Sequence, residues 1–139
     1  MSDPNYNRKS VWFIIQIATI LTLLSRTAVA DEPRRNAFPS VLLGRWAETA
    51  EQCTAKDKSN ILIEDTKYGD AHGSCDVRWI VDTPGSHGTN YAVHALCTSA
   101  SDSAKTQNVN IIIRPQGGDR ALMGRSFEDL KNYHRCPAE

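Results

Sequence analysis

The chain has no long uninterrupted apolar run, no excess of charge of one sign, no closely spaced cysteines and no signature of a known catalytic centre. Sixteen basic residues balance sixteen acidic residues, so the formal net charge is zero. Proteins that bind nucleic acid or an anionic membrane surface usually carry concentrated positive charge. The balance of charges therefore argues against both kinds of partner.

The apolar run VWFIIQIATILTLL, residues 11–24, is too short to cross a bilayer as a helix, which needs about 20 apolar residues. Two basic residues precede it, and the small residues of an AVA sequence follow, ending at Ala30 before Asp31. This pattern predicts a secretory signal peptide over residues 1–30, cleaved between Ala30 and Asp31. An uncleaved membrane anchor is the alternative. We expect a bacterial protein that is periplasmic or secreted and has no membrane contact after cleavage.

All four cysteines follow the predicted cleavage point: Cys53, Cys75, Cys97 and Cys136. Zinc sites usually contain pairs of ligands at close spacing, such as C-x2-C, whereas these cysteines are separated by 22, 22 and 39 positions. An even number of cysteines in a small exported domain indicates disulfides. The sequence therefore predicts two disulfides, and no metal or other cofactor.

Two segments in the middle of the chain, residues 75–82 and 90–97, alternate apolar and polar side chains with the period of a β-strand. The loop between them is rich in proline and glycine. A hairpin folded about Ser86 brings the apolar residues of both strands onto one face. In that register Trp79 lies opposite Val93, and both side chains point into the core.

The same register places Cys75 directly opposite Cys97. Opposed residues of an antiparallel pair have Cα atoms about 4.5 to 5.5 Å apart, which suits a disulfide. Cys75–Cys97 is therefore the first pairing that we expect. By elimination, Cys53 then joins Cys136, although the other two pairings stay open.

A second hairpin is predicted in the segment NVNIIIRPQGGDRALMGR, which has two apolar arms around Gly117-Gly118. Gly-Gly is a favoured two-residue hairpin loop because both positions can adopt positive φ. With that loop, Ile113 lies opposite Leu122.

Short strands at residues 42–47 and 60–65 bring the expected total to about six. Ser126 and Asp129 have the S-x-x-D spacing of a capping box, which predicts a short helical turn over residues 127–132. A brief extended piece is expected to follow as far as Cys136. The expected fold is all-β: a small antiparallel meander barrel or sandwich with a C-terminal helical turn and two disulfides, formed by residues 42–139 as a single domain. Residues 31–41 are expected to be a flexible leader.

The tripeptide Gly44-Arg45-Trp46 resembles the G-x-W start of lipocalin-like proteins. In that family the tryptophan closes one end of the barrel, and an arginine from near the C-terminus often packs over it. The resemblance implies structural roles for Gly44 and Trp46, and it implies that Arg135 lies over the Trp46 ring as a cation–π partner.

A wider pattern combines this G-x-W with a nearby cysteine, C-x-V, Y-x-V-x-x-x-C and a terminal R-C, and it spans most of residues 44–136. It is similar to small secreted proteins of unknown function from alphaproteobacteria, which implies no assigned activity. The opening is also similar to lipocalin-like periplasmic inhibitors of metallopeptidases. That similarity implies that residues 31–39 enter the cleft of a protease.

Candidate catalytic and metal-binding residues are few. His72 and His87 lie in glycine-rich loops beside Ser74 and Ser86, but no nucleophile elbow or other signature accompanies them. Asp70 together with the two loop histidines is the weak candidate for a metal site. We expect these residues to be solvated, and the protein not to be an enzyme.

On the sheet, His94 is expected to face Arg78 and to stay neutral. Trp79, Tyr91 and Val93 are candidates to line a ligand cavity, but side chains usually fill the interior of a barrel of this size. The sequence thus predicts an exported, disulfide-stabilised barrel that binds a partner without catalysing a reaction. The alternatives are an envelope inhibitor of a protease or lysozyme, and a carrier of a small apolar ligand.

Overall fold

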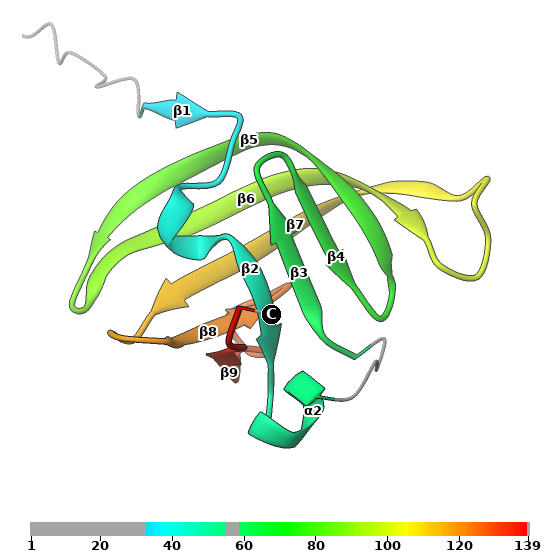
Figure 1. Ribbon diagram of the computed structural model, residues 1–139. Helices are drawn as coiled ribbons and strands as arrows, with labels where there is room; N and C mark the ends of the chain where they lie inside the picture. The colour runs from blue at the N-terminus through cyan, green and yellow to red at the C-terminus, as the bar shows by residue number, and fades with distance from the viewer. Residues whose placement is uncertain (1–32, 55–58, 139) are drawn as a thin grey trace, which may run out of the picture. The chain divides into compact units, whose positions relative to one another are not determined.

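The structure, a computed structural model, describes residues 33–54 and 59–138. In this part of the chain it contains nine strands, one turn of 3-10 helix and one short α-helix (Figure 1). The strands are β1 (Arg34–Arg35), β2 (Gly44–Ala47), β3 (Ile61–Glu64), β4 (Lys67–Asp70), β5 (Gly73–Gly85), β6 (Gly88–Ser99), β7 (Thr106–Pro115), β8 (Arg120–Gly124) and β9 (Lys131–Arg135). The helices are η1 (Ser40–Leu42) and α2 (Ala50–Thr54).

Strands β2 to β9 pair antiparallel in the order of the chain, and β9 pairs back onto β2. Eight strands therefore form a closed meander barrel, in which the long, curved strands β5 and β6 form much of the wall (Figure 1). Strand β1 lies outside this ring and pairs only with β5. Of the two expected architectures the barrel is confirmed, whereas the expected number of strands was too low.

Strand β9 begins at Lys131, inside the segment for which a helical turn was predicted, so that prediction was wrong. The extended piece expected before Cys136 is present as the rest of β9. Ser126 and Asp129 do interact: the Asp129 N–H donates to the Ser126 carbonyl at 3.3 Å, and the two side chains are 3.0 Å apart. This interaction makes a turn and not a helix. Strands β8 and β2 flank the following residues and satisfy their backbone groups, and this pairing outweighs the local capping signal.

A β-bulge at Arg78 interrupts β5. The predicted register holds as far as Val77, but beyond the bulge Trp79 lies opposite His94 rather than Val93. One extra residue reverses the two faces of a strand. Ile80 is consequently the core residue, fully buried, while Trp79 is 39% exposed on the outer wall, so the expectation that Trp79 lies in the core was wrong.

The second hairpin is also shifted by one residue. Its loop spans residues 117–119, one residue more than a two-residue Gly-Gly turn, and its two glycines have φ values of +87° and +60°. Ile113 therefore pairs with Met123 and not with Leu122. The shift places Met123 on the inner face, where it is 1% exposed.

The described part of the predicted leader is not a free tether. Arg34 and Arg35 pair with β5, and the Phe38 N–H donates to the carbonyl of Asp65 at 2.7 Å. Phe38 and Leu42 are 5% and 1% exposed. Burying each side chain contributes about 2 kcal/mol, which is enough to hold the leader against the barrel.

Trp46 and Arg135 close the end of the barrel at which η1 lies. Trp46 is 2% exposed, and its Nε1–H donates to the Leu42 carbonyl at 3.0 Å. The Arg135 guanidinium lies 4.5 Å from the Trp46 ring centroid and donates to the Leu43 carbonyl. Gly44, at φ +120°, lies beside this guanidinium. The expected packing of Arg135 over Trp46 is confirmed.

Both predicted disulfides are present. Cys75–Cys97 joins β5 and β6, and Cys53–Cys136 joins α2 to the residue that follows β9. The predicted cleavage point at Ala30 lies outside the described residues. Among the helices that the structure describes, none is long and apolar enough to cross a membrane.

Candidate functional site

The end of the barrel away from η1 is hollowed. Its lining residues lie in or beside the last residues of β2, β4, β6 and β8 and the first residues of β3, β7 and β9, which meet at one end of the barrel. The 3-10 helix η1 precedes β2 and lies at the other end. We call the hollowed end the mouth. It contains a β6–β7 hollow of about 470 Å³ and a β8–β9 hollow of about 570 Å³. Ala71, His72 and Arg125 line both hollows, which therefore adjoin.

The period of the strands explains why polar side chains gather at the mouth. On β7 and β8 the inner row is apolar along the barrel and ends in a polar residue: Arg125 follows Met123, and Gln107 precedes the buried β7 residues. Ser99 and Asp70 occupy the same position on β6 and on β4. Of these residues, only Asp70 was a candidate site residue from the sequence. A polar residue at the last inward position of an apolar row is the signal that could have identified the rest.

An ion pair between Arg125 and Asp70 joins strands β8 and β4 across the mouth. The Arg125 Nη2 group lies 3.1 Å from Asp70 Oδ2 and 3.4 Å from Oδ1. The two side chains are 32% and 12% exposed, so water reaches the pair only in part. Asp70 Oδ1 also accepts the backbone N–H of His72 at 2.8 Å, which fixes the carboxylate and hence the arginine.

Two tyrosines line the β8–β9 hollow. Burial raises the pKa of Tyr68 well above its ordinary value, and the negative charge of Asp70 adds to the effect. Burial, followed by the charge of Glu48, raises the pKa of Tyr133 to about 12. Glu48 accepts from the Tyr133 hydroxyl at 3.3 Å and from the Lys131 ammonium at 3.0 Å. Both phenols therefore remain neutral hydrogen-bonding groups at physiological pH.

The raised pKa of Tyr133 predicts a loss of stability at high pH. The pKa rises from an ordinary 10 to about 12 on folding, so its stabilising contribution is complete below pH 10 and disappears as the pH rises to 12. In an absorbance titration at high pH, Tyr133→Phe is expected to remove a phenol that ionises near pH 12, above the ordinary value. An unchanged titration curve in the variant would contradict this assignment.

The histidines lie far apart in the barrel. His72 lines the mouth, whereas His87 lies in the β5–β6 hairpin loop at the other end of those strands. His94 is on the outer wall, where its ring stacks on Trp79 with the centroids 4.8 Å apart. The prediction that His94 faces Arg78 was therefore wrong. Arg78 lies in the β-bulge, so Trp79 takes the position opposite His94.

The weak catalytic and metal candidates are consequently not assembled. Asp70 and His72 are neighbours, but His87 is not near them. Within residues 33–54 and 59–138, no group of three or more potential ligand side chains is placed to hold a metal ion. In the same ranges, neither Ser74 nor Ser86 forms a hydrogen bond to a histidine ring.

Comparisons with known proteins identify no relative of this chain. No protein family, curated protein or solved structure matches it. The features that bear on its function are those of the mouth: adjoining hollows, an oriented ion pair, and polar side chains at the end of an apolar wall.

Proposed function

We propose that this protein is an exported, disulfide-stabilised binding protein, without enzymatic activity, that holds a small polar ligand in its mouth. The observation that carries the proposal is the change of the inner wall from apolar to polar around the fixed Arg125–Asp70 pair. Sites for small ligands are concave, about 300 to 1,000 Å³ in volume, and orient the ligand with a few placed polar groups. Both hollows of the mouth lie in that size range.

The two disulfides support the exported location. Disulfides persist in oxidising compartments and are rare in the reducing cytosol. A cleaved signal peptide over residues 1–30 and a periplasmic or secreted destination are part of the same proposal.

The geometry favours a polar ligand over the apolar ligand of a carrier. Large side chains fill the barrel below the mouth, including Trp46, Ile111 and Met123, each at most 2% exposed. Trp79, a candidate for an apolar cavity, lies on the outer wall. An apolar ligand would therefore have to displace the packed core.

The geometry also favours the mouth over the leader as the binding element. Insertion of residues 31–39 into a protease cleft requires a free leader, whereas Arg34 and Arg35 pair with β5 and Phe38 is buried. An inhibitor of this kind would have to release those contacts before it could bind.

Filling the mouth is expected to prevent ligand binding. Ala71 lines both hollows and is exposed, so Ala71→Trp places a large ring in the mouth without disturbing the core. The wild-type protein, purified from its own host, is expected to retain a small ligand in native mass spectrometry. The Ala71→Trp variant is expected to lose it.

Ser86→Trp, in the distant β5–β6 loop, is the matched control and is expected to keep the ligand. Retention of the same ligand by both variants would overturn the proposal, because the ligand would then bind outside the mouth. A wild-type protein without any bound ligand, even after addition of host extract, would also overturn it.

A further inference from the structure

The ionisable side chains that line the β6–β7 hollow are all basic. Arg125, Lys105 and His72 are among the residues that line it, and none of its lining residues is an aspartate or glutamate. The remaining polar groups are hydroxyls and the amide of Gln107. A hollow with two permanent cations, several neutral donors and no carboxylate favours an anion.

Arg125 is held so that part of its guanidinium stays available. Asp70 takes only the Nη2 group, and among the described residues the Nε and Nη1 groups form no hydrogen bond. The planar guanidinium presents its N–H donors in a fixed fork that matches the two oxygens of a carboxylate or phosphate. Because Asp70 fixes its orientation, little side-chain freedom is lost when a ligand binds.

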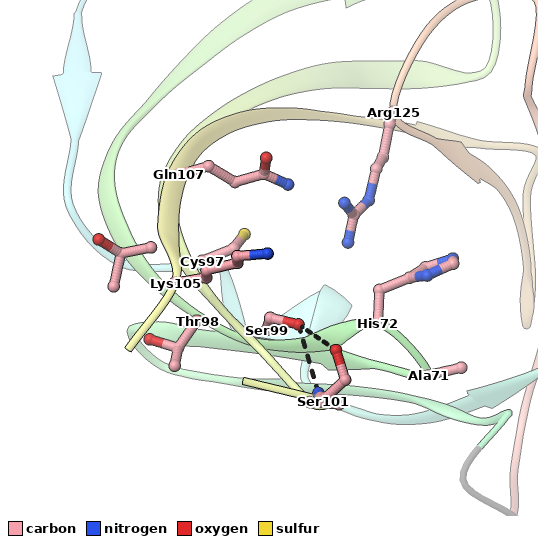
Figure 2. Close-up of a pocket in the computed structure, with 11 residues that line it drawn as sticks. Ala71, His72, Cys97, Thr98, Ser99, Ser101, Lys105, Gln107 and Arg125 are labelled. Carbon is pink, nitrogen blue, oxygen red and sulfur yellow. Dashed lines mark hydrogen bonds between the residues drawn. The ribbon is translucent and has the colours of Figure 1, made fainter. Parts of the chain in front are cut away.

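Two further side chains from β7 and the loop before it point to the same space. Figure 2 shows the Lys105 ammonium, the Gln107 amide and the Arg125 guanidinium directed toward the middle of the hollow. Ser99 and Ser101 form its floor and hydrogen-bond to each other at 3.0 Å. These donors come from separate elements, so an anion placed among them would be contacted from several sides.

Apart from Asp70, which holds one end of the Arg125 guanidinium, the neighbouring carboxylates do not line the hollow. Asp102, in the β6–β7 loop, accepts the Ala104 N–H at 3.1 Å and so caps its own loop. Glu48, Glu128 and Asp129 line only the β8–β9 hollow, on the other side of the ion pair. Negative charge on that side disfavours an anion there and directs it to the β6–β7 hollow.

We propose that the β6–β7 hollow binds an oxyanion, either a carboxylate or a phosphate group, with Arg125 as its main contact and Lys105 and Gln107 as supporting donors. This inference rests on the proposed function, since it names the part of the ligand that the mouth recognises. Carboxylate and phosphate share the paired oxygens that a guanidinium binds, and separate titrations distinguish them.

The test is an NMR titration of the isotope-labelled protein with sodium phosphate and, separately, with sodium acetate, at constant ionic strength. At least one anion is expected to shift the Arg125 side-chain signals and the backbone signals of Ser99 to Gln107. Arg125→Gln is expected to weaken this binding by about tenfold or more, the loss for one hydrogen bond to a charged group. Lys105→Gln, which leaves the ion pair with Asp70 intact, is expected to weaken it severalfold.

Arg120→Gln is the matched control, because Arg120 is exposed at the first position of β8, at the opposite end of the strand that Arg125 follows. It is expected to bind the anion as the wild type does. The inference is overturned if neither anion binds, if Arg125→Gln and Lys105→Gln both bind normally, or if uncharged acetamide binds as tightly as acetate. Each of these results leaves the proposed function standing when Ala71→Trp still abolishes retention of the native ligand.

Discussion

Replacing Trp46 with alanine is expected to lower the free energy of unfolding by about 3 to 5 kcal/mol, the range for loss of a large aromatic side chain from a core. Trp46 is 2% exposed, donates to the Leu42 carbonyl and supports the Arg135 guanidinium. Its removal opens a cavity at the closed end and leaves Arg135 over an empty space. Urea denaturation followed by circular dichroism measures the loss.

Trp79 provides a control with the same change of side chain. It is 39% exposed on the outer wall, where its ring stacks on His94 and lies under the Arg34 guanidinium. Trp79→Ala is therefore expected to cost about 1 kcal/mol. Equal losses in the two variants would contradict both the closed-end role of Trp46 and the reversal of faces at the β5 bulge.

Removal of the Cys53–Cys136 disulfide is expected to destabilise the barrel by about 4 to 5 kcal/mol. This bridge joins residues 83 positions apart, so in the unfolded chain it restricts most of the described residues. The expected loss follows from the loop-entropy relation, in which the cost grows with the logarithm of loop length. The double variant Cys53→Ala with Cys136→Ala, measured by urea denaturation without reductant, provides the test.

The Cys75–Cys97 disulfide provides a comparison for the expected loss of stability. Cys75–Cys97 spans only 22 positions, and its loop contribution is about 3 kcal/mol. A Cys53→Ala, Cys136→Ala protein as stable as the wild type would show that the barrel closes without the bridge. That result would limit the bridge to a local role between α2 and β9.

Regular alternation made the central strands predictable, and local irregularities limited the prediction. Cys75 lies opposite Cys97 on the side of the bulge away from the hairpin loop, where the register expected from matching apolar residues holds. Beyond Arg78 the segment offers Trp79, Ile80 and Val81 in succession, so the apolar pattern fits either phase. Only pairing with β6 and β1 selects Ile80 for the core, and this choice is not local.

Strand β4 was missed, and β9 was predicted only as a brief extended piece, for a different reason. Their sequences, KYGD and KNYHR, are polar and short, and each has only one or two inward side chains. Such segments become strands because neighbours on both sides satisfy their backbone groups. The leader was expected to be flexible because it contains many charged residues. Its sequence did not show that the Phe38 side chain is buried in the core.

The residues of the mouth could be grouped only once the pairing register of the strands was known. Arg125, Lys105 and His72 are far apart in the sequence, and each is an ordinary surface residue in isolation. The closed end was easier to predict, because the resemblance of residues 44–46 to a G-x-W start implied the roles of Gly44, Trp46 and Arg135. The mouth belongs to no recognised pattern, and its chemistry emerges only when eight strands bring their ends together.

The seam of the barrel lies between its first and last strands along the chain. Trp46 pairs with Arg135, so β2 keeps one edge unpaired until β9 has been made. Unpaired edges attract other strands, and in a nascent chain this means self-association before folding is complete. A chain interrupted before Lys131 would hold seven strands in an open sheet with β2 and β8 exposed. Strand β9 therefore removes both exposed edges at once, and the Cys53–Cys136 bridge holds the closed barrel together beside this seam.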